Sequence, residues 1–395
     1  MPSAGAEPAT PAPPLPHRML LYVSSVEGGI THCCHYQAEE LQARGVDVTM
    51  LCGKAYPWQQ DQVSYRQLRR FPRIVGKGFT ARLRRFLAVL GNHWRLAWHV
   101  ARERPDVVLL EANTEYFSLL WIWPHLLLRA LGVTYIANFH DPVRKVRYGM
   151  PRLHGLELAL FYRILRGGLI HGEVPAEAWI PRWIALEVVP HGPFPHLASQ
   201  PVPFDLRERL GIGPDRFVLL SFGLVTDYKN LDLLIEAAAR VEGVDLVIAG
   251  KVKSSGERTI ASYRDAAALH GVADRVHFVE GFIPEAEIPA YFNAADAVAL
   301  TYQREFVSQS GVLQLAVIWQ KQVLASSGPG PLQDAVSRFD LGIFVEPDSV
   351  DSATKGLESL RFSPRDRREN FNRYDAETAW SANIDGLARL LNRVR

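Results

Sequence analysis

Apolar and polar positions alternate in a regular way along residues 217–250. The run from Phe217 to Phe222 is apolar and rich in residues that favour strands, and a second such run extends from Val244 to Ala249. Between them, apolar side chains recur at the helical period from Leu231 to Val241. The pattern predicts a strand, a helix and a second strand, which is the βαβ unit of a parallel sheet.

The loop after the first of these strands has the composition of an anion-binding site. It begins at Gly223 and carries Lys229 shortly before the predicted helix. A lysine ammonium and the free amides of a helix N-terminus both attract anions. We therefore expect this loop to bind two phosphate groups of a ligand.

Strands and helices alternate in the same way along most of the chain, which predicts an α/β protein with parallel sheets. At 395 residues the chain is too long for one ordinary core, so we expect two domains. The predicted strands are Met19–Ser25, Val46–Leu51, Asp106–Glu111, Val133–Phe139, Leu186–Val189, Phe217–Phe222, Val244–Ala249, Val276–Val279 and Ala297–Thr301. The predicted helices are Thr31–Arg44, Glu115–Leu131, Leu231–Val241, Thr259–His270, Glu285–Asn293 and Asp375–Val394.

Composition narrows the class of protein. Hydrophobic residues make up 48% and charged residues 22%, as in globular proteins, and a net charge of +2 gives no general attraction to nucleic acid. The three cysteines, Cys33, Cys34 and Cys52, are too few for a disulfide framework, which favours a reducing cytosol. Residues 1–17 are rich in Pro and Ala and are expected to be a disordered tail, not a signal peptide. The apolar stretch 117–137 is interrupted by Pro124 and is expected to be a buried helix leading into a strand, not a membrane span.

A basic segment covers residues 62–85, which contain no acidic side chain. Its cations are interleaved with Phe71, Phe79 and Leu83, so residues 66–85 are a candidate contact for anionic lipid or for a phosphate-bearing acceptor. A solvated surface helix explains the same composition equally well. The cations are Arg66, Arg69, Arg70, Arg73, Lys77, Arg82, Arg84 and Arg85.

Several nucleotide and metal motifs are missing from the sequence. It contains no Asp-x-Asp, no G-x-G-x-x-G after a strand, no G-x-x-x-x-G-K-[S/T], no HExxH and no C-x-x-C. These absences argue against a dinucleotide dehydrogenase, a nucleotide hydrolase and a metal-dependent transferase. We expect neither a metal nor a cofactor.

Four stretches after residue 217 resemble the C-terminal half of retaining glycosyltransferases of the GT-B fold, the family 4 type and its bacterial exopolysaccharide relatives. They are SFGLVTDYKNLDLLIEAAARV, VDLVIAGK, RVHFVEGFIPEAEIPAYFNAADAVALTY and SQSGVLQLAVIWQKQVLASSGPGPLQDAV. The resemblance implies two Rossmann-like parallel-sheet domains facing a central cleft. It places an acceptor domain at 18–195, a linker at 196–214 and a nucleotide-sugar donor domain at 215–374. It also implies that residues 375–395 form a helix that returns to the N-terminal domain, with Trp380 either an anchor between domains or an ordinary core side chain.

The resemblance also assigns roles in the donor domain. Lys229 and the helix start at Ser310, Gly311 and Val312 would hold the diphosphate, and the backbone of Gly281, Phe282 and Ile283 would meet the nucleobase. Glu305 matches the first of two glutamates that the family carries, but the second falls on Leu313 or Leu315, and Gln314 is the nearest polar substitute. The Gly-Arg of the phosphate loop is replaced by Gly223-Leu224, so Lys251, Lys253 or Arg304 would have to supply the missing cation. The remaining donor candidates are Gly28, Gly29 and Gly250.

In the N-terminal domain, NFHDP matches the family motif in which a histidine at the end of a strand lies near the transferred sugar. His140 is therefore a candidate catalytic residue together with Lys229 and Glu305, although a histidine bonded to a loop carbonyl is the alternative. Candidates for contact with the acceptor or its phosphate are Asp141, Arg144, Arg147 and His191.

These features together predict a metal-independent, retaining glycosyltransferase. It would move a hexose from a nucleoside diphosphate sugar to a hydroxyl of a saccharide or lipid-linked acceptor, in the cytoplasm or at the inner face of the membrane. A non-catalytic GT-B scaffold that binds a sugar nucleotide or a partner is the alternative. A nucleotide-sugar epimerase or phosphorylase on this fold is less favoured, because nothing resembles a cofactor lysine or a paired carboxylate site.

Overall fold

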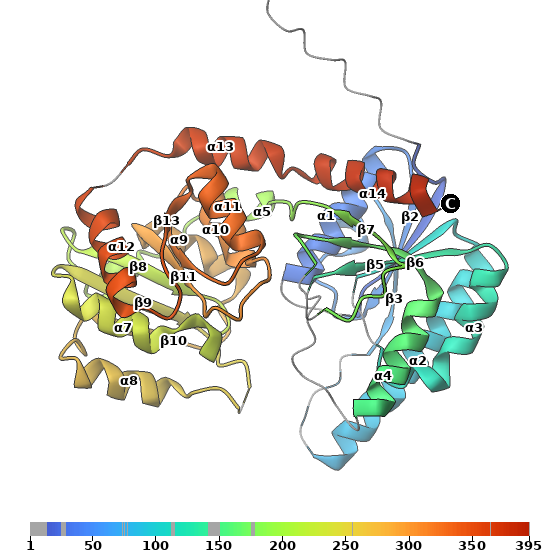
Figure 1. Cartoon of the computed structure of the whole chain (residues 1–395), viewed down its shortest axis with the longest axis horizontal. Coiled ribbons are helices and arrows are strands. Elements are labelled where there is room, and N and C mark those ends of the chain that lie inside the picture. Colours follow the sequence, from blue (N-terminus) through green and yellow to red (C-terminus); the bar gives the residue numbers. More distant parts are fainter. Residues whose placement is uncertain are drawn as a thin grey trace, which may run out of the picture. The chain divides into compact units, whose positions relative to one another are not determined.

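The structure is a computed structural model that describes residues 14–24, 29–72, 74, 76, 78–111, 115–140, 151–174, 178–254, 256–363 and 365–394. The chain divides into two compact units (Figure 1). The N-terminal unit comprises Met1–Pro190 together with Trp380–Arg395, and the C-terminal unit comprises His191–Ala379. Each unit is built on its own sheet, and every strand pairing in the two sheets is parallel. The expected class, an α/β fold with two Rossmann-like domains, is confirmed.

The sheet of the N-terminal unit has seven strands in the order β3-β2-β1-β4-β5-β6-β7. They are β1 (Arg18–Tyr22), β2 (Asp47–Gly53), β3 (Arg66–Phe71), β4 (Val107–Leu110), β5 (Thr134–Phe139), β6 (Leu165–Ile170) and β7 (Ala185–Val188). The helices of this unit are α1 (Gly29–Ala43), α2 (Phe79–Glu103), α3 (Ser118–Ala130), α4 (Pro151–Ile164) and α14 (Trp380–Val394). A short 3-10 helix, η1, covers Gln60–Gln62.

Successive side chains of each strand point to opposite faces of this sheet, so the unit has two cores. Met19 and Leu21 of β1 pack with α1 and α14 on one face. Leu20 and Tyr22 pack with α2, α3 and α4 on the other. Because both faces are covered, the central strands β1, β4 and β5 are largely apolar, as is usual for parallel sheets.

The sheet of the C-terminal unit has six strands in the order β10-β9-β8-β11-β12-β13. They are β8 (Phe217–Phe222), β9 (Val244–Gly250), β10 (Val276–Glu280), β11 (Ala297–Thr301), β12 (Gln322–Ser326) and β13 (Gly342–Phe344). One face packs against α7 (Leu231–Arg240), α8 (Ile260–Leu269) and α12 (Val350–Phe362). The other helices are α5 (Pro195–Ala198), α6 (Leu206–Leu210), α9 (Ile288–Ala294), α10 (Gly311–Ile318), α11 (Pro331–Phe339) and α13 (Arg368–Glu377), with η2 (Asp227–Lys229) and η3 (Glu285–Glu287).

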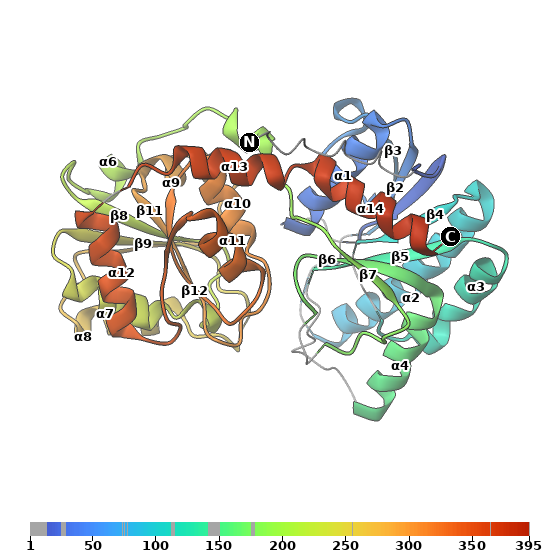
Figure 2. The same cartoon turned by 45° about the horizontal axis from the view of Figure 1, so that its top comes forward.

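The helix expected from Asp375 to Val394 is interrupted. Helix α13 ends at Glu377 in the C-terminal unit, and α14 begins at Trp380 in the N-terminal unit, where it lies along α1, β6 and β7 (Figure 2). Trp380 is 7% exposed and stacks on Tyr36 of α1, with ring centroids 5.8 Å apart, so it packs within the N-terminal unit. The interruption follows from the chain changing units, since a continuous helix would hold residues 368–394 in one rigid rod.

Two other segments differ from expectation. Residues 196–214, expected to be a linker, include α6 and most of α5, and both helices belong to the C-terminal unit. The segment from Arg66 to Phe71 is the edge strand β3, and the helix that follows it begins only at Phe79. The segment reads RQLRRF, and its apolar residues Leu68 and Phe71 are three positions apart, so it lacks the alternation that predicts a strand.

Helix α3 is not buried on all sides. Trp121, Ile122 and His125 face the core, but Trp123 is 59% exposed and Leu127 is 61% exposed. The expectation of a buried helix was therefore wrong for its outer side. Within the described part of the chain, no helix is both long and apolar enough to cross a membrane.

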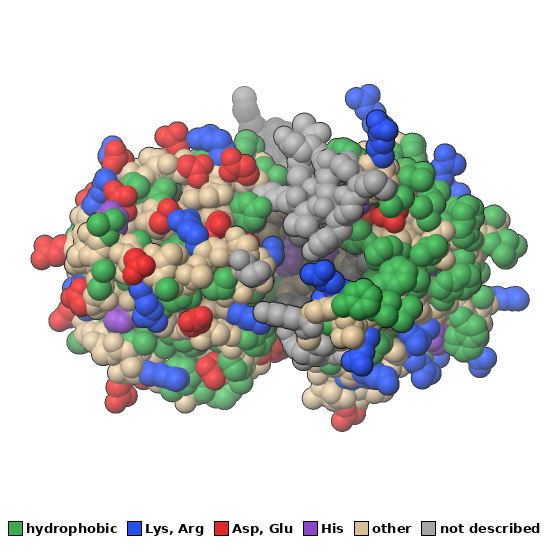
Figure 3. Space-filling model, turned by 90° about the horizontal axis from the view of Figure 1, so that it is seen from below, with side chains coloured by type: hydrophobic (Ala, Val, Ile, Leu, Met, Phe, Trp, Pro, Cys, Tyr) green, Lys and Arg blue, Asp and Glu red, His purple; other side chains and the backbone are tan. Residues whose placement is uncertain are grey.

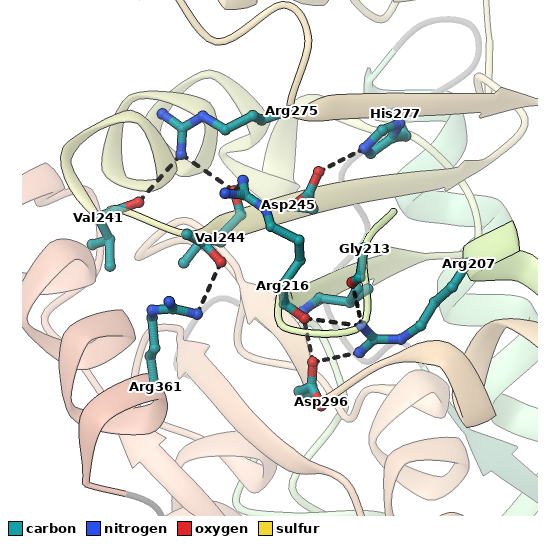
Figure 4. Close-up of polar contacts among 12 residues, drawn as sticks. Arg207, Gly213, Arg216, Val241, Val244, Asp245, Arg275, His277, Asp296 and Arg361 are labelled. Atoms are coloured by element: carbon teal, nitrogen blue, oxygen red, sulfur yellow. Dashed lines mark hydrogen bonds and ion pairs between the residues drawn. The ribbon is translucent and has the colours of Figure 1, made fainter. Parts of the chain in front are cut away.

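Charged side chains tie together the amino-terminal ends of the strands in the C-terminal unit (Figure 4). Asp245 of β9 is 4% exposed and accepts from Arg216 and from His277 Nε2, the latter at 2.8 Å. Arg207 of α6 donates to Asp296 Oδ2 at 2.7 Å and to the carbonyl of Arg216 at 2.9 Å. These contacts join β8, β9, β10 and the loop before β11 at one edge of the sheet.

Replacing Asp245 by Asn is expected to lower the free energy of unfolding of the C-terminal unit by about 2 kcal/mol, because a buried hydrogen-bonded carboxylate loses its charge. Urea unfolding followed by circular dichroism measures the change. Asp351→Asn is the matched control, since Asp351 also pairs with an arginine, Arg240, but its side chain is 79% exposed. Equal midpoints for the two variants would contradict the structural role of Asp245.

Candidate active site

The loop after β8 lies at the carboxyl edge of the C-terminal sheet, where ligands bind in open α/β folds. Gly223 adopts a φ of 89° and donates its amide to Ala249 O at 2.9 Å. Val225 then forms a parallel bridge with Val252, with its amide 2.9 Å from Lys251 O. The loop is thus held along the chain that leaves β9.

Gly250, at the end of β9, allows this arrangement. A Cβ at that position would lie 1.8 Å from the carbonyl oxygen of Gly223, which is backbone and cannot rotate aside. Only glycine therefore permits the two strand ends to approach this closely. The requirement for glycine at 250 arises from packing of the loop.

Lys229 is the last residue of η2 and turns back toward the end of β8. Its Nζ donates to the carbonyl of Phe222, and its own carbonyl accepts from Thr301 Oγ1 at 3.1 Å. The residue retains some exposed surface, but its ammonium lies under protein atoms, and this desolvation lowers its pKa to about 7 from an ordinary value of 10.5. The folded protein therefore binds fewer protons here than the unfolded chain between these two values. The contribution of Lys229 to stability consequently rises with pH across that window.

The start of α10 lies beside the same loop. A Cβ on Gly223 would be 3.7 Å from Val312 Cγ2 and 3.8 Å from Lys229 Nζ. The structure therefore brings Gly223, Lys229 and the first turn of α10 together, although they come from separate segments. Amides in the first turn of a helix have no acceptor within the helix and carry the positive end of its dipole.

Ser310 precedes α10 but makes no side-chain cap. Its hydroxyl is 2.9 Å from the hydroxyl of Tyr302, and the residue is only 3% exposed. Tyr302 in turn stacks on Phe306 with centroids 4.0 Å apart. The hydroxyl of Ser310 thus fixes the loop that leads into α10, and Gly311 and Val312 present its first amides.

Sequence reasoning missed Asp348, which connects two of these segments. Its Oδ1 accepts from Asn230 Nδ2 at 2.8 Å, and its Oδ2 accepts from the amide of Arg304 at 3.1 Å. Asn230 and Asp348 both adopt positive φ, 49° and 61°, which is uncommon outside glycine. The Asp-Ser pair after β13 predicts a turn at Asp348. It does not predict the partners of Asp348, because they lie far away in the sequence.

The remaining donor candidates differ in position. Gly281 follows β10 and donates its amide to Gly250 O at 3.2 Å, which places it at the same sheet edge. Next to it, Phe282 is 63% exposed and Ile283 is partly exposed. Lys251 and Glu305 are exposed.

Gln314 has a different environment. It is fully buried, and its Nε2 donates to the hydroxyl of Tyr374 in α13 at 2.8 Å. Its side chain therefore packs inside the unit and does not reach the surface of the Gly223 loop.

In the N-terminal unit, His140 follows the end of β5 and is part of a polar chain. Its Nε2 lies 3.4 Å from Glu111 Oε2, and its Nδ1 lies 3.2 Å from His171 Nε2. His171 Nδ1 lies 3.1 Å from Val189 O. Each of these three contacts needs one hydrogen atom between its two heavy atoms, but two neutral imidazoles carry only two N–H groups in total. The chain is complete when one ring is an imidazolium or Glu111 is protonated.

Glu111 follows the end of β4 and was not singled out from the sequence. It is 1% exposed, and its Oε2 also accepts from Asn138 Nδ2 at 3.2 Å. Cys33 Sγ, Glu111 and His140 offer ligand atoms within 4.8 Å of one another. Burial, together with the charge of Glu111, raises the pKa of the Cys33 thiol well above its usual value, so this sulfur is a protonated thiol and a poor metal ligand. An acidic residue at the carboxyl end of a buried strand was the signal for Glu111.

The remaining candidate site residues of the N-terminal half do not belong to this polar chain. Gly29 is the first residue of α1. His191 is 8% exposed, and its Nδ1 donates to Gly192 O at 3.0 Å. Four further candidates lie outside the described residues, namely Gly28, Asp141, Arg144 and Arg147.

Two family models match the chain, one in each half. Residues 27–169 match the model described as Glycosyltransferase Family 4, and residues 204–378 match the model described as Glycosyl transferases group 1. The chain belongs to the family 4 type of GT-B glycosyltransferases. The family resemblance inferred from the motifs is thereby confirmed.

Similar proteins and structures agree with this membership. A D-inositol 3-phosphate glycosyltransferase 2 of Catenulispora acidiphila is 27% identical over 199 residues, which cover 47% of this GT-B chain and 45% of the relative. The enzyme named D-inositol 3-phosphate glycosyltransferase from Mycobacteroides abscessus is 27% identical over 186 residues, 46% of this chain and 40% of the relative. The chain thus matches less than half the length of these relatives.

Solved structures extend the likeness over the whole fold. Anabaena HepE in complex with UDP and glucose has a TM-score of 0.69 and 17% identity, covering 95% of this chain and 98% of HepE. Sucrose-phosphate synthase from Thermosynechococcus elongatus has a TM-score of 0.66 and 20% identity, with coverage of 95% and 98%. At these identities the likeness establishes the GT-B fold.

Replacing Gly250 by Ala is expected to push the Gly223 loop from its place and to lower the free energy of unfolding by more than the roughly 1–2 kcal/mol that a left-handed backbone costs an ordinary residue. Gly211→Ala is the control, because Gly211 has a φ of 69° but no atom within 4 Å of its Cβ position. Urea unfolding of both variants separates the two effects. A loss at Gly250 no larger than at Gly211 would show that the close contact is unimportant.

Proposed function

We propose that this protein transfers a hexose from a nucleoside diphosphate sugar to a hydroxyl group of a saccharide or lipid-linked acceptor, without a metal ion and with retention of the anomeric configuration. The observation that carries the proposal is the convergence of Lys229, the Gly223 loop and the start of α10 at the carboxyl edge of the C-terminal sheet. The names of the relatives and the UDP held by HepE support a nucleoside diphosphate donor.

The negative charge of the donor diphosphate matches the positive groups that meet at Lys229 and the start of α10. When the bond from the sugar to the diphosphate breaks, negative charge develops on the leaving phosphate oxygen. An ammonium and the amides of a helix N-terminus, already in place, stabilise that charge without reorganising. Lys229 supplies the cation, and Gly311 and Val312 supply the amides. These groups do what a metal ion does in other transferases, which is the physical reason for a metal-independent reaction.

The other donor contacts follow from position. The backbone at Gly281 and the exposed side chain of Phe282 are proposed to bind the nucleobase, beside Gly250. Glu305 is proposed to bind hydroxyl groups of the donor sugar. Lys251 is an exposed cation next to the Gly223 loop and is proposed to replace the arginine that the family pattern has in that loop.

His140 is proposed to act on the sugar or the acceptor, with Glu111 and His171 fixing its ring. Both ring nitrogens of His140 are engaged by Glu111 and His171, so a hydrogen bond from His140 to the sugar or the acceptor has to replace one of these two contacts. His191 remains a candidate for acceptor contact. A non-catalytic scaffold is not favoured, since both family models that match describe transferases.

Binding of UDP to this site is expected to take up a proton near pH 8. Lys229 has a pKa of about 7 in the free protein, so it is largely neutral at pH 8, and a bound diphosphate favours its charged form. The affinity should therefore fall as the pH rises above 7. Calorimetric titration in HEPES and in Tris, whose ionisation enthalpies differ, measures the proton taken up.

Lys229→Met should abolish this proton uptake and weaken UDP binding roughly 10- to 100-fold, the value of a charge-assisted hydrogen bond. Lys321→Met is the matched control, because burial also lowers the pKa of Lys321, which precedes β12 at the other edge of the sheet. Unchanged proton uptake in Lys229→Met, or an equal loss in both variants, would remove Lys229 from the site.

Glu111→Gln and His140→Gln are expected to lower kcat by similar factors and to be non-additive when combined, because Glu111 acts through His140. Initial rates of sugar transfer for the wild type, both single variants and the double variant complete the cycle. Thermal unfolding of each variant checks that the fold survives. Fully additive losses would show that Glu111 has a separate, structural role.

A further inference from the structure

Helices α2, α3 and α4 form one layer on the N-terminal unit. Helix α3 packs against both α2 and α4, and the inner sides of all three join the core below the sheet. In α2 the residues that face this core are Leu96 and Val100, and in α3 they are Trp121 and Ile122. The outer sides of these helices form the surface that we call the α2–α4 face.

The α2–α4 face is apolar where a surface helix is normally polar. Along α2, exposed side chains recur at helical spacing from Phe79, which is 80% exposed, to Trp98, which is 56% exposed. Along α3 they recur from Leu120 to Leu131. Trp179 lies against Gly155 of α4 and continues the apolar surface. The exposed hydrophobic side chains are Phe79, Leu83, Leu87, Trp94, Trp98, Phe117, Leu120, Trp123, Leu127, Leu131, Leu153, Leu156, Trp179 and Trp183.

Among the described residues, such a concentration of exposed hydrophobic side chains occurs in this unit and not in the C-terminal unit. Figure 3 shows a continuous area of hydrophobic side chains on the N-terminal unit, with Lys and Arg beside it, whereas the types are interspersed on the C-terminal unit. The large hydrophobic side chains exposed in the C-terminal unit are scattered over separate elements, namely Val202, Leu224, Leu269, Phe282 and Phe362. Contiguous exposed apolar surface of this kind marks a binding surface.

The charge of the α2–α4 face is of one sign. Of the two acidic residues in these helices, Glu157 is 7% exposed and Glu103 is paired with Arg66. The cations are Arg82, Arg84, Arg85, Arg95, Arg102, Arg129, Arg152 and Arg163. A partner must therefore offer an apolar interior and negative charge at the same surface.

We propose that the α2–α4 face lies on an anionic lipid bilayer, with its Trp and Leu side chains inserted at the level of the headgroups and its arginines paired with lipid phosphates. Trp and Arg are favoured at this depth because each combines an apolar body with a polar tip. A second copy of the chain fits less well, since a symmetric pairing of this face would set arginines against arginines.

The surface differs from the contact expected for residues 66–85. Arg66 donates to Glu103 Oε2 at 2.7 Å and to Thr49. Arg69 donates to the carbonyls of Lys54, Tyr56 and Trp58. These two arginines hold β3 in the fold. Of the segment 66–85, the proposed lipid contact therefore keeps only residues 79–85, at the start of α2, and extends from there over α3 and α4.

Vesicle co-sedimentation tests the proposal without any donor or acceptor, so its failure is separate from failure of the proposed transfer. The full chain is mixed with vesicles of phosphatidylcholine alone, or of phosphatidylcholine with phosphatidylglycerol. We expect binding to the anionic vesicles, weakened by salt, and little binding to the neutral ones.

Two double variants separate the contributions of charge and of apolar side chains to vesicle binding. Arg82→Gln with Arg84→Gln should lower partitioning to anionic vesicles roughly fivefold for each charge removed. Trp98→Gln with Trp123→Gln should lower it at every salt concentration, because the lost contribution is apolar. Lys355→Gln with Arg365→Gln and, separately, Leu269→Gln are the controls, exposed residues of the C-terminal unit whose replacement should change nothing.

Three results would overturn the proposal. They are equal binding to neutral and anionic vesicles, binding that survives both double variants, and no vesicle binding at all. In the last case sedimentation velocity without lipid would show whether the face joins two copies of the chain, as a dimer that Trp98→Gln with Trp123→Gln dissociates. Thermal unfolding establishes that each variant is folded.

Discussion

The close approach of two backbone segments, Gly250 at the end of β9 and the carbonyl of Gly223 after β8, sets the geometry of the candidate donor site. With these strand ends in contact, the loop is held along residues 251–253, and Lys229 turns back onto Phe222. The first turn of α10 then lies within van der Waals distance of the same loop. A Cβ atom at position 250 would clash with the carbonyl of Gly223, so this arrangement requires glycine there.

The two ends of the strands in the C-terminal sheet differ in how their charged side chains are paired. At the amino ends of the strands, Asp245 accepts from Arg216 and Asp296 accepts from Arg207 and from the amide of Val218, and these contacts bind the strands together. At the carboxyl edge, Lys229 has an ammonium that burial drives toward its neutral form, which is unfavourable until an anion arrives. A group held in this state gains most from binding a diphosphate.

The two faces of the N-terminal sheet also have different partners. Helices α1 and α14 cover one face, and the polar pair Gln37 and Asn383 joins them through a 2.9 Å hydrogen bond. The layer of α2, α3 and α4 covers the other and leaves an apolar, cationic outer side. This outer side carries the proposed lipid contact, while the polar chain of Glu111, His140 and His171 lies at the carboxyl ends of the strands.

The local pattern of the sequence predicted nine strands of the two sheets and the composition of the proposed phosphate loop, since side-chain period and the residues Gly223 and Lys229 lie within short segments. It did not predict β3, β6, β12 or β13. Strands β8 and β11 were predicted with the bounds that the structure has: a charged residue precedes each run, and Gly223 ends the first. Only the tertiary structure decided which distant groups meet: Gly250 with Gly223, Asp348 with Asn230, Glu111 with His140, and Gln314 with Tyr374. It also decided that α3 exposes one apolar side. The spacing of apolar residues along a helix shows which side of it would be buried. Whether another element of the protein covers that side depends on how the helices and sheets pack together.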